Sequence, residues 1–148
     1  MSHTTEINNI VFNDIDALRL AVADLNKAGV KCDLAEKSTA RAYYPNQPGM
    51  SGTLDYVLRL HGSRYDVAFV KDEKAKGYVA RTDLWGGDVE KVLGAKCAAG
   101  ENQAQAALGK LYQSYAINAA TRQAAKQGYA VRKVTKADST VQLIMNVH

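Results

Sequence analysis

The chain has few cysteines and no long apolar run. Cys32 and Cys97 stand far apart, without a second thiol or a histidine at the spacing of a zinc site, so neither a metal site nor a disulfide scaffold is expected. Both side chains are expected to be buried or half-buried as small apolar groups. No apolar stretch approaches the roughly 18 residues of a membrane-spanning helix, so a membrane partner is not expected.

The N-terminal residues lack the basic segment followed by an apolar segment that is typical of a secretory signal. A cytoplasmic location is therefore expected. The composition, with 47% hydrophobic and 23% charged residues, excludes a disordered tail, a collagen-like fibre and a coiled coil. A length of 148 residues predicts a single domain over residues 1–148, with a core large enough to need no metal, cofactor or disulfide.

Basic and acidic residues balance in the first two thirds of the chain, so the net charge of +4 arises in the last third. Only Glu101 and Asp138 offset the cations there. A local surplus of this kind indicates which surface meets an anion. The basic residues of this segment are Lys110, Arg122, Lys126, Arg132, Lys133 and Lys136.

Hydrophobic spacing predicts a first helix over residues 14–28, with Asp14 as its N-cap and Gly29 closing it. Short strands are predicted at 6–12, 30–34 and 39–44, the last two around a charged turn at Glu36 and Lys37. Both prolines lie in the segment 45–48, which predicts a loop.

Alternating residues over 54–60, 65–69 and 78–81 predict a meander of three antiparallel strands, because the connections are too short for a parallel return. A short helix is predicted over 88–93, with Asp88 as its cap. The longest helix is predicted from Asn102 to Gln127, ending at Gly128, and two more strands at 129–134 and 140–147.

One stripe of the long helix is apolar and is expected to pack on the sheet. These elements define an α+β fold, with an antiparallel sheet of about five to seven strands and both long helices packed on it. The stripe consists of Leu108, Leu111, Tyr112, Tyr115, Ala116 and Ala119.

Several short motifs, in order along the chain, resemble the plastid ycf-thirty-five-like family, a small-domain family of unknown function in plastids, cyanobacteria and bacteriophages. The motifs are MSHT at 1–4, DAL at 16–18, YDVAF at 65–69, DLW at 83–85, LYQSYA at 111–116 and AKQGYAV at 125–131. The resemblance implies a fold and no reaction. A phage-encoded protein of this kind would act in the host cytoplasm. The chain is longer than the family pattern around 44–53 and 96–105.

No motif points to catalysis. His3, His61 and His148 have no sequence neighbour that would make them bases or metal ligands. Gly86 and Gly87 lack the spacing and the lysine of a phosphate-binding loop and are expected to turn the chain. A non-enzymatic protein is therefore expected.

Arg122 and Lys126 project onto the apolar stripe of the long helix, where charge is unexpected. In one interpretation they stabilise the carbonyl end of their own helix, with their stems packed on the sheet. In the other, they form an anion site at the sheet edge together with Arg132 and Lys133.

Arg41, Tyr43 and Tyr44 form a second candidate site, because an arginine beside two tyrosines can stack on bases or bind a protein. The leading hypothesis is a non-catalytic binding domain for an anionic ligand, a nucleotide or nucleic acid, or for a host macromolecule. Sequence-specific DNA binding is disfavoured because no helix has a dense basic face. The alternatives are a homo-oligomeric assembly protein and an uncharacterised small enzyme.

Overall fold

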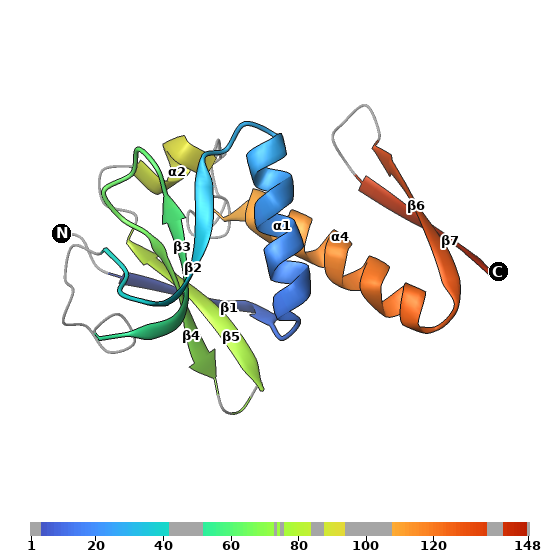
Figure 1. The fold of residues 1–148 in the computed structure, drawn as a ribbon, viewed down its shortest axis with the longest axis horizontal. Coiled ribbons are helices and arrows are strands. Elements are labelled where there is room, and N and C mark those ends of the chain that lie inside the picture. The colour runs from blue at the N-terminus through green and yellow to red at the C-terminus, as the bar shows by residue number, and fades with distance from the viewer. Residues whose placement is uncertain are drawn as a thin grey trace.

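A five-stranded antiparallel sheet forms one side of the molecule (Figure 1). The computed structural model describes residues 4–41, 52–72, 74, 76–83, 88–93, 108–135 and 141–147. The strand order is β1-β5-β4-β3-β2, so the predicted meander β3-β4-β5 is confirmed. The strands are β1 (Thr4–Phe12), β2 (Cys32–Ser38), β3 (Leu54–Leu60), β4 (Val67–Asp72) and β5 (Gly77–Asp83).

The prediction of two strands around a turn at Glu36 and Lys37 is wrong, because β2 continues through both residues. Its pairing with β3 places Glu36 opposite Tyr56 and Ser38 opposite Leu54. Ladder hydrogen bonds from a distant segment thus outweigh the local turn preference. Lys37 accommodates this with a positive φ of 47°. Residues 39–41 are not strand, and 42–44 lie outside the described residues.

The first helix, α1 (Ile15–Lys27), confirms its prediction at both ends. The carboxylate of Asp14 accepts the Ala17 N–H at 3.1 Å and caps the first turn. After Ala28 the chain reverses at Gly29, whose φ of +97° is in the left-handed region that glycine adopts without strain.

The long helix, α4 (Gly109–Lys126), ends as predicted before Gly128, whose φ is +86°. The helix begins later than predicted: its first residue is Gly109, and Leu108 before it is in a turn. Residues 101–107 lie outside the described part of the chain. Ala116 is exposed, although the sequence placed it on the packing stripe.

The helices share one core with one face of the sheet. Phe12 and Phe69 pack edge to face with ring centroids 5.1 Å apart, and Tyr115 packs on Phe12 at 4.7 Å. The short helix α2 (Asp88–Leu93) contributes Val89 and Leu93 to this core. The expected burial of Cys32 is confirmed, and Cys97 lies outside the described residues.

The last two strands, β6 (Tyr129–Thr135) and β7 (Val141–Val147), form an antiparallel hairpin that is a separate sheet. β6 packs against α4, and Figure 1 shows the hairpin at the side of the helices that faces away from the five-stranded sheet. The α+β fold is as predicted, with five strands in the main sheet. The single domain over 1–148 stays a prediction.

Candidate anion-binding site

The helices α1 and α4 pack against each other, and part of their contact consists of hydrogen bonds between polar groups. The Ser114 hydroxyl donates to the carbonyl of Ala21 at 3.3 Å, and the Asn118 amide donates to the Asp24 carboxylate at 2.9 Å. These bonds set the distance between the helices near the C-terminal half of α1. They also explain why Ala116 is exposed, since α4 turns toward α1 the face that carries Ser114 and Asn118.

A cavity of about 250 Å³ opens where the C-terminal half of α1, the first turns of α4 and β6 meet. Lys110 comes from α4 and Lys133 from the hairpin, so elements distant in sequence bring two lysine side chains to one hollow. Asp24, together with apolar and uncharged polar side chains, completes its wall. The full lining is Asp24, Leu25, Ala28, Lys110, Gln113, Ser114, Ile117 and Lys133.

The charges in this cavity are unequal. Asp24 is the one carboxylate among the lining residues, and Asn118 already donates to it. Within the described residues, neither Lys110 nor Lys133 forms an ion pair. An incoming anion would therefore meet two cations and one carboxylate that is hydrogen-bonded to a neutral amide.

Arg122 does not stabilise the carbonyl end of its own helix, so that interpretation is wrong for Arg122, whereas Lys126 does lie in the last turn of α4. Its guanidinium reaches across to the start of α1, where Nε lies 2.9 Å from Asp14 Oδ2 and a terminal nitrogen lies 3.3 Å from Asp16 Oδ2. The two carboxylates at a helix N-terminus explain why a cation lies on the packing stripe. Arg122 is therefore already paired with two carboxylates, which makes it a weak candidate for binding an anionic ligand.

The pKa of Asp14 records this pairing. Burial opposes ionisation of the carboxyl, but the hydrogen bonds from Arg122 and from the Ala17 N–H, with the charges of Arg122 and Lys126, outweigh it and lower the pKa of Asp14. Lys126 thus contributes to the same charge cluster at the start of α1. It is exposed and does not line the cavity.

Arg132 and Lys133 are neighbours on β6, so their side chains point to opposite faces of the hairpin. Lys133 faces the cavity, and Arg132 is exposed on the other face, at the register position of Ile144. The four C-terminal cations of the sequence hypothesis are therefore divided among three places.

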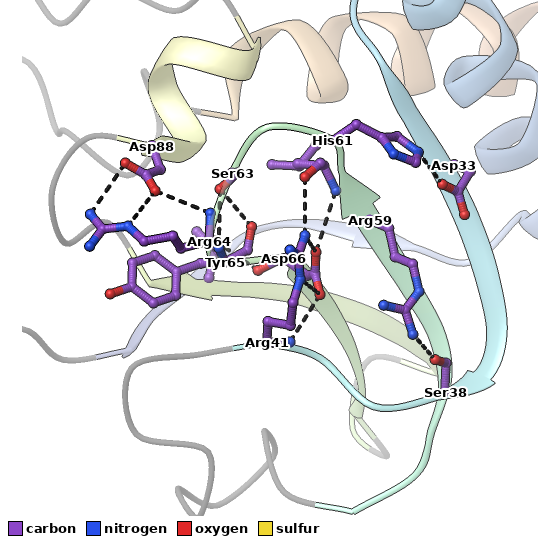
Figure 2. A network of polar contacts seen from close by, with 12 residues as sticks. Asp33, Ser38, Arg41, Arg59, His61, Ser63, Arg64, Tyr65, Asp66 and Asp88 are labelled. Carbon is purple, nitrogen blue, oxygen red and sulfur yellow. Dashed lines mark hydrogen bonds and ion pairs between the residues drawn. The ribbon is translucent and has the colours of Figure 1, made fainter.

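Arg41 belongs to a polar network around the turn between β3 and β4 (Figure 2). The Asp66 side chain is fully buried and accepts from the Arg41 backbone N–H at 2.9 Å and from its guanidinium at 3.0 and 2.6 Å. The hydrogen bond with Asp66 raises the pKa of Arg41. Because a buried carboxylate needs this partner, we assign Arg41 a structural role. Tyr43 and Tyr44 lie outside the described residues.

Two further pairs frame the same turn in Figure 2. Arg64 holds Asp88 at 2.7 Å, and the His61 ring nitrogen lies 2.6 Å from Asp33. Asp88, predicted as a helix cap, thus faces Arg64, and the hydrogen bonds from that residue lower the pKa of Asp88. Arg41 and Arg64 each have a carboxylate partner, and Arg59 donates to the Ser38 hydroxyl, so these three guanidinium groups are engaged within the protein.

A second cavity of about 250 Å³ lies at the β2 end of the sheet and is lined by Glu36, Lys37, Asp55, Tyr56 and Tyr78. Both of its carboxylates already have a partner. Tyr78 donates to Asp55 at 2.8 Å, and Arg19 pairs with Glu36. Burial first, and then the hydrogen bond to Asp55, raise the pKa of Tyr78 to about 12.

Lys110 and Asp24 were missed as site residues. The signal that could have found Lys110 is a helical stripe, since Lys110, Gln113, Ser114 and Ile117 recur at spacings of three and four and line one hollow. Its juxtaposition with Lys133 depends on how β6 returns along α4, which no local pattern encodes.

Fold and cavity together define an α+β domain with a basic hollow beside its helices. Comparisons of the chain with protein-family models, with curated proteins and with solved structures found no match. Across the described residues, no group of three histidine, cysteine or carboxylate side chains could hold a metal. None of the helices in those ranges is long and apolar enough to cross a membrane.

Proposed function

We propose that the chain is a non-catalytic binding domain that takes an anionic ligand in the cavity between α1, α4 and β6. The observation that carries the proposal is the convergence of Lys110 and Lys133 on one hollow, from elements that are separate in sequence. Ammonium groups bind phosphate and carboxylate oxygens as point charges. A site of this kind needs no catalytic group.

The size of the cavity favours a small anionic group. About 250 Å³ is slightly below the range of about 300–1,000 Å³ that holds drug-sized ligands. A phosphate with part of its sugar would occupy it, against the apolar wall of Leu25 and Ile117. A nucleotide, or the end of a single-stranded nucleic acid, is the ligand class that we propose.

This proposal moves the site away from Arg122 and Arg41, which are held by carboxylates. It retains Lys133, adds Lys110, and leaves Lys126 and Arg132 outside the cavity. The resemblance to the plastid ycf-thirty-five-like family remains a proposal about ancestry and assigns no ligand. Of the two alternatives, the hairpin favours an assembly role.

The test compares two double variants of equal charge. Binding of ATP, inorganic phosphate and a labelled single-stranded oligonucleotide is titrated against wild type, Lys110→Ala/Lys133→Ala and Lys126→Ala/Arg132→Ala. We expect the cavity variant to lose about tenfold or more in affinity, since tenfold corresponds to only about 1.4 kcal/mol. The second variant should lose much less, because its charges lie outside the cavity.

A change of the opposite sign tests the same cavity. Asp24→Asn removes its carboxylate while Asn118 keeps an oxygen to donate to, so anion affinity should rise a few-fold. Absence of binding by the wild type would overturn the proposal. Equal losses in the two double variants would show that net charge alone attracts the anion.

A further inference from the structure

The β6-β7 hairpin is a two-stranded sheet of its own. Within the described residues its strands pair only with each other, and β6 packs against α4. Among its described side chains none is buried, although Val131, Val134, Leu143 and Ile144 are apolar. A lone two-stranded hairpin is marginally stable in water and gains stability from packing against a helix or from further strands. The helix α4 supplies the first through β6, and an added strand would supply the second.

The edge where strands could be added is that of β7. In the described part of the chain, β7 pairs with β6 alone, so its outer edge presents backbone N–H and C=O groups to no other strand. The seven residues VQLIMNV contain no charge and no proline, and their register with β6 has no bulge. Charged residues, prolines and β-bulges are means by which proteins protect an exposed strand edge from pairing, and β7 has none of these three.

We infer that the β7 edge pairs with the β7 edge of a second copy of this chain, giving a four-stranded sheet across a twofold axis. Charge selects this edge over the other. If β6 paired with its own copy about its centre, Arg132 would lie opposite Arg132, and like charges directly opposite destabilise a sheet. β7 pairs with itself without any charge.

The sequence of β7 is self-complementary about Ile144. Antiparallel pairing on a twofold axis at this residue places Ile144 opposite its own copy and Leu143 opposite Met145. Gln142 then lies opposite Asn146, and Val141 opposite Val147. Apolar residues meet apolar ones, and the two amides meet each other.

The assembly stops at two copies, because the pairing uses the free β7 edge of each copy. The outer strands of the four-stranded sheet are then the two β6 strands, which pack against α4 and carry Arg132 and Lys133. One pair of seven-residue strands buries a modest area. We therefore expect a dimer that dissociates on dilution rather than a permanent one.

Light scattering coupled to gel filtration measures this directly. The wild-type mass should rise with concentration from 16.1 kDa toward twice that value. Ile144→Lys places two ammonium groups together on the axis and should give a monomer. Gln142→Lys adds the same charge on the same face, but opposite Asn146, and should still dimerise. A wild type that is monomeric up to its solubility limit, or one that forms larger oligomers, overturns the inference.

A disulfide cross-link tests the register even if the lysine variant folds poorly. In a Cys97→Ser background, Ile144→Cys should form a covalent dimer on mild oxidation, since strand neighbours lie within disulfide reach. Gln142→Cys should not, because its own copy is distant in this register. Cross-linking that is equal in the two variants, or absent in both, overturns the proposed pairing.

Discussion

Two side chains of α4, those of Tyr115 and Arg122, hold the first turn of α1. The Tyr115 hydroxyl accepts the N–H groups of Asn13 and Asp14 at 3.1 Å each and donates to Asn13 Oδ1 at 3.1 Å. Backbone N–H groups at a helix start need acceptors. The chain thus uses its C-terminal third to cap its N-terminal helix.

Tyr115→Phe should lower the free energy of unfolding by about 1–3 kcal/mol, since two N–H groups lose their acceptor while the ring remains. Urea unfolding followed by circular dichroism measures the change. The control is Tyr112→Phe on the same helix. The Tyr112 hydroxyl is buried without a partner in the described residues, so its removal should be neutral or stabilising. Equal losses in both variants would contradict the capping role.

The charged residues on the helical stripe were visible in the sequence, but their partners were not. A spacing of about 100° per residue places Arg122 among apolar side chains. Its carboxylate partners lie 106 and 108 positions earlier, beyond the reach of any local pattern. The same reason hid Asp66 as the partner of Arg41. The sequence thus identified candidate cationic residues, but it could not show which of them are already paired with a carboxylate in the folded protein.

Helix ends and strands differed in how well the sequence predicted them. Both ends of α1 and the end of α4 depend on residues within one turn, Asp14, Gly29 and Gly128, and were predicted correctly. The extent of β2 depends on β3, so local turn preference gave a wrong boundary. The strand pairing of β1 with β5 likewise needed the folded chain.

Gly77 and Gly109 lie in different surroundings: a side chain would clash at Gly77, whereas there is open space at Gly109. A Cβ on Gly77 would lie 2.6 Å from Val11 Cγ1 and 3.1 Å from the Phe12 carbonyl oxygen, where the end of β1 lies beside the start of β5. Gly77→Ala should therefore cost about 1–3 kcal/mol of unfolding free energy. Gly109 meets nothing within 4 Å at the start of α4. Gly109→Ala should stabilise by up to about 1 kcal/mol.

Urea midpoints of both variants at an unchanged m-value check the comparison. If Gly109→Ala destabilised as much as Gly77→Ala, the packing explanation would fail.

The buried side chains of the main core are unevenly distributed along the chain. Among the residues that the structure describes, the main core takes side chains from the sheet and the three helices and none from residues 129–147. Deletion of everything after Gly128 should therefore leave a chain that unfolds cooperatively, with a loss of unfolding free energy smaller than the roughly 2–5 kcal/mol of a single Leu→Ala change in the core. Circular dichroism and urea unfolding measure this. A deletion variant that fails to fold would show that the hairpin supports the core.

The contacts of Tyr115 and Arg122 with the start of α1 also order events during synthesis. A growing chain makes α1 early, yet the groups that hold its first turn emerge only with the last third of the polypeptide. Contacts between distant segments must wait for that chain to be available. The N-terminal helix therefore acquires its final anchoring as translation ends, and a ribosome that stalls before Tyr115 would display α1 with its first turn held by the Asp14 cap and not by α4.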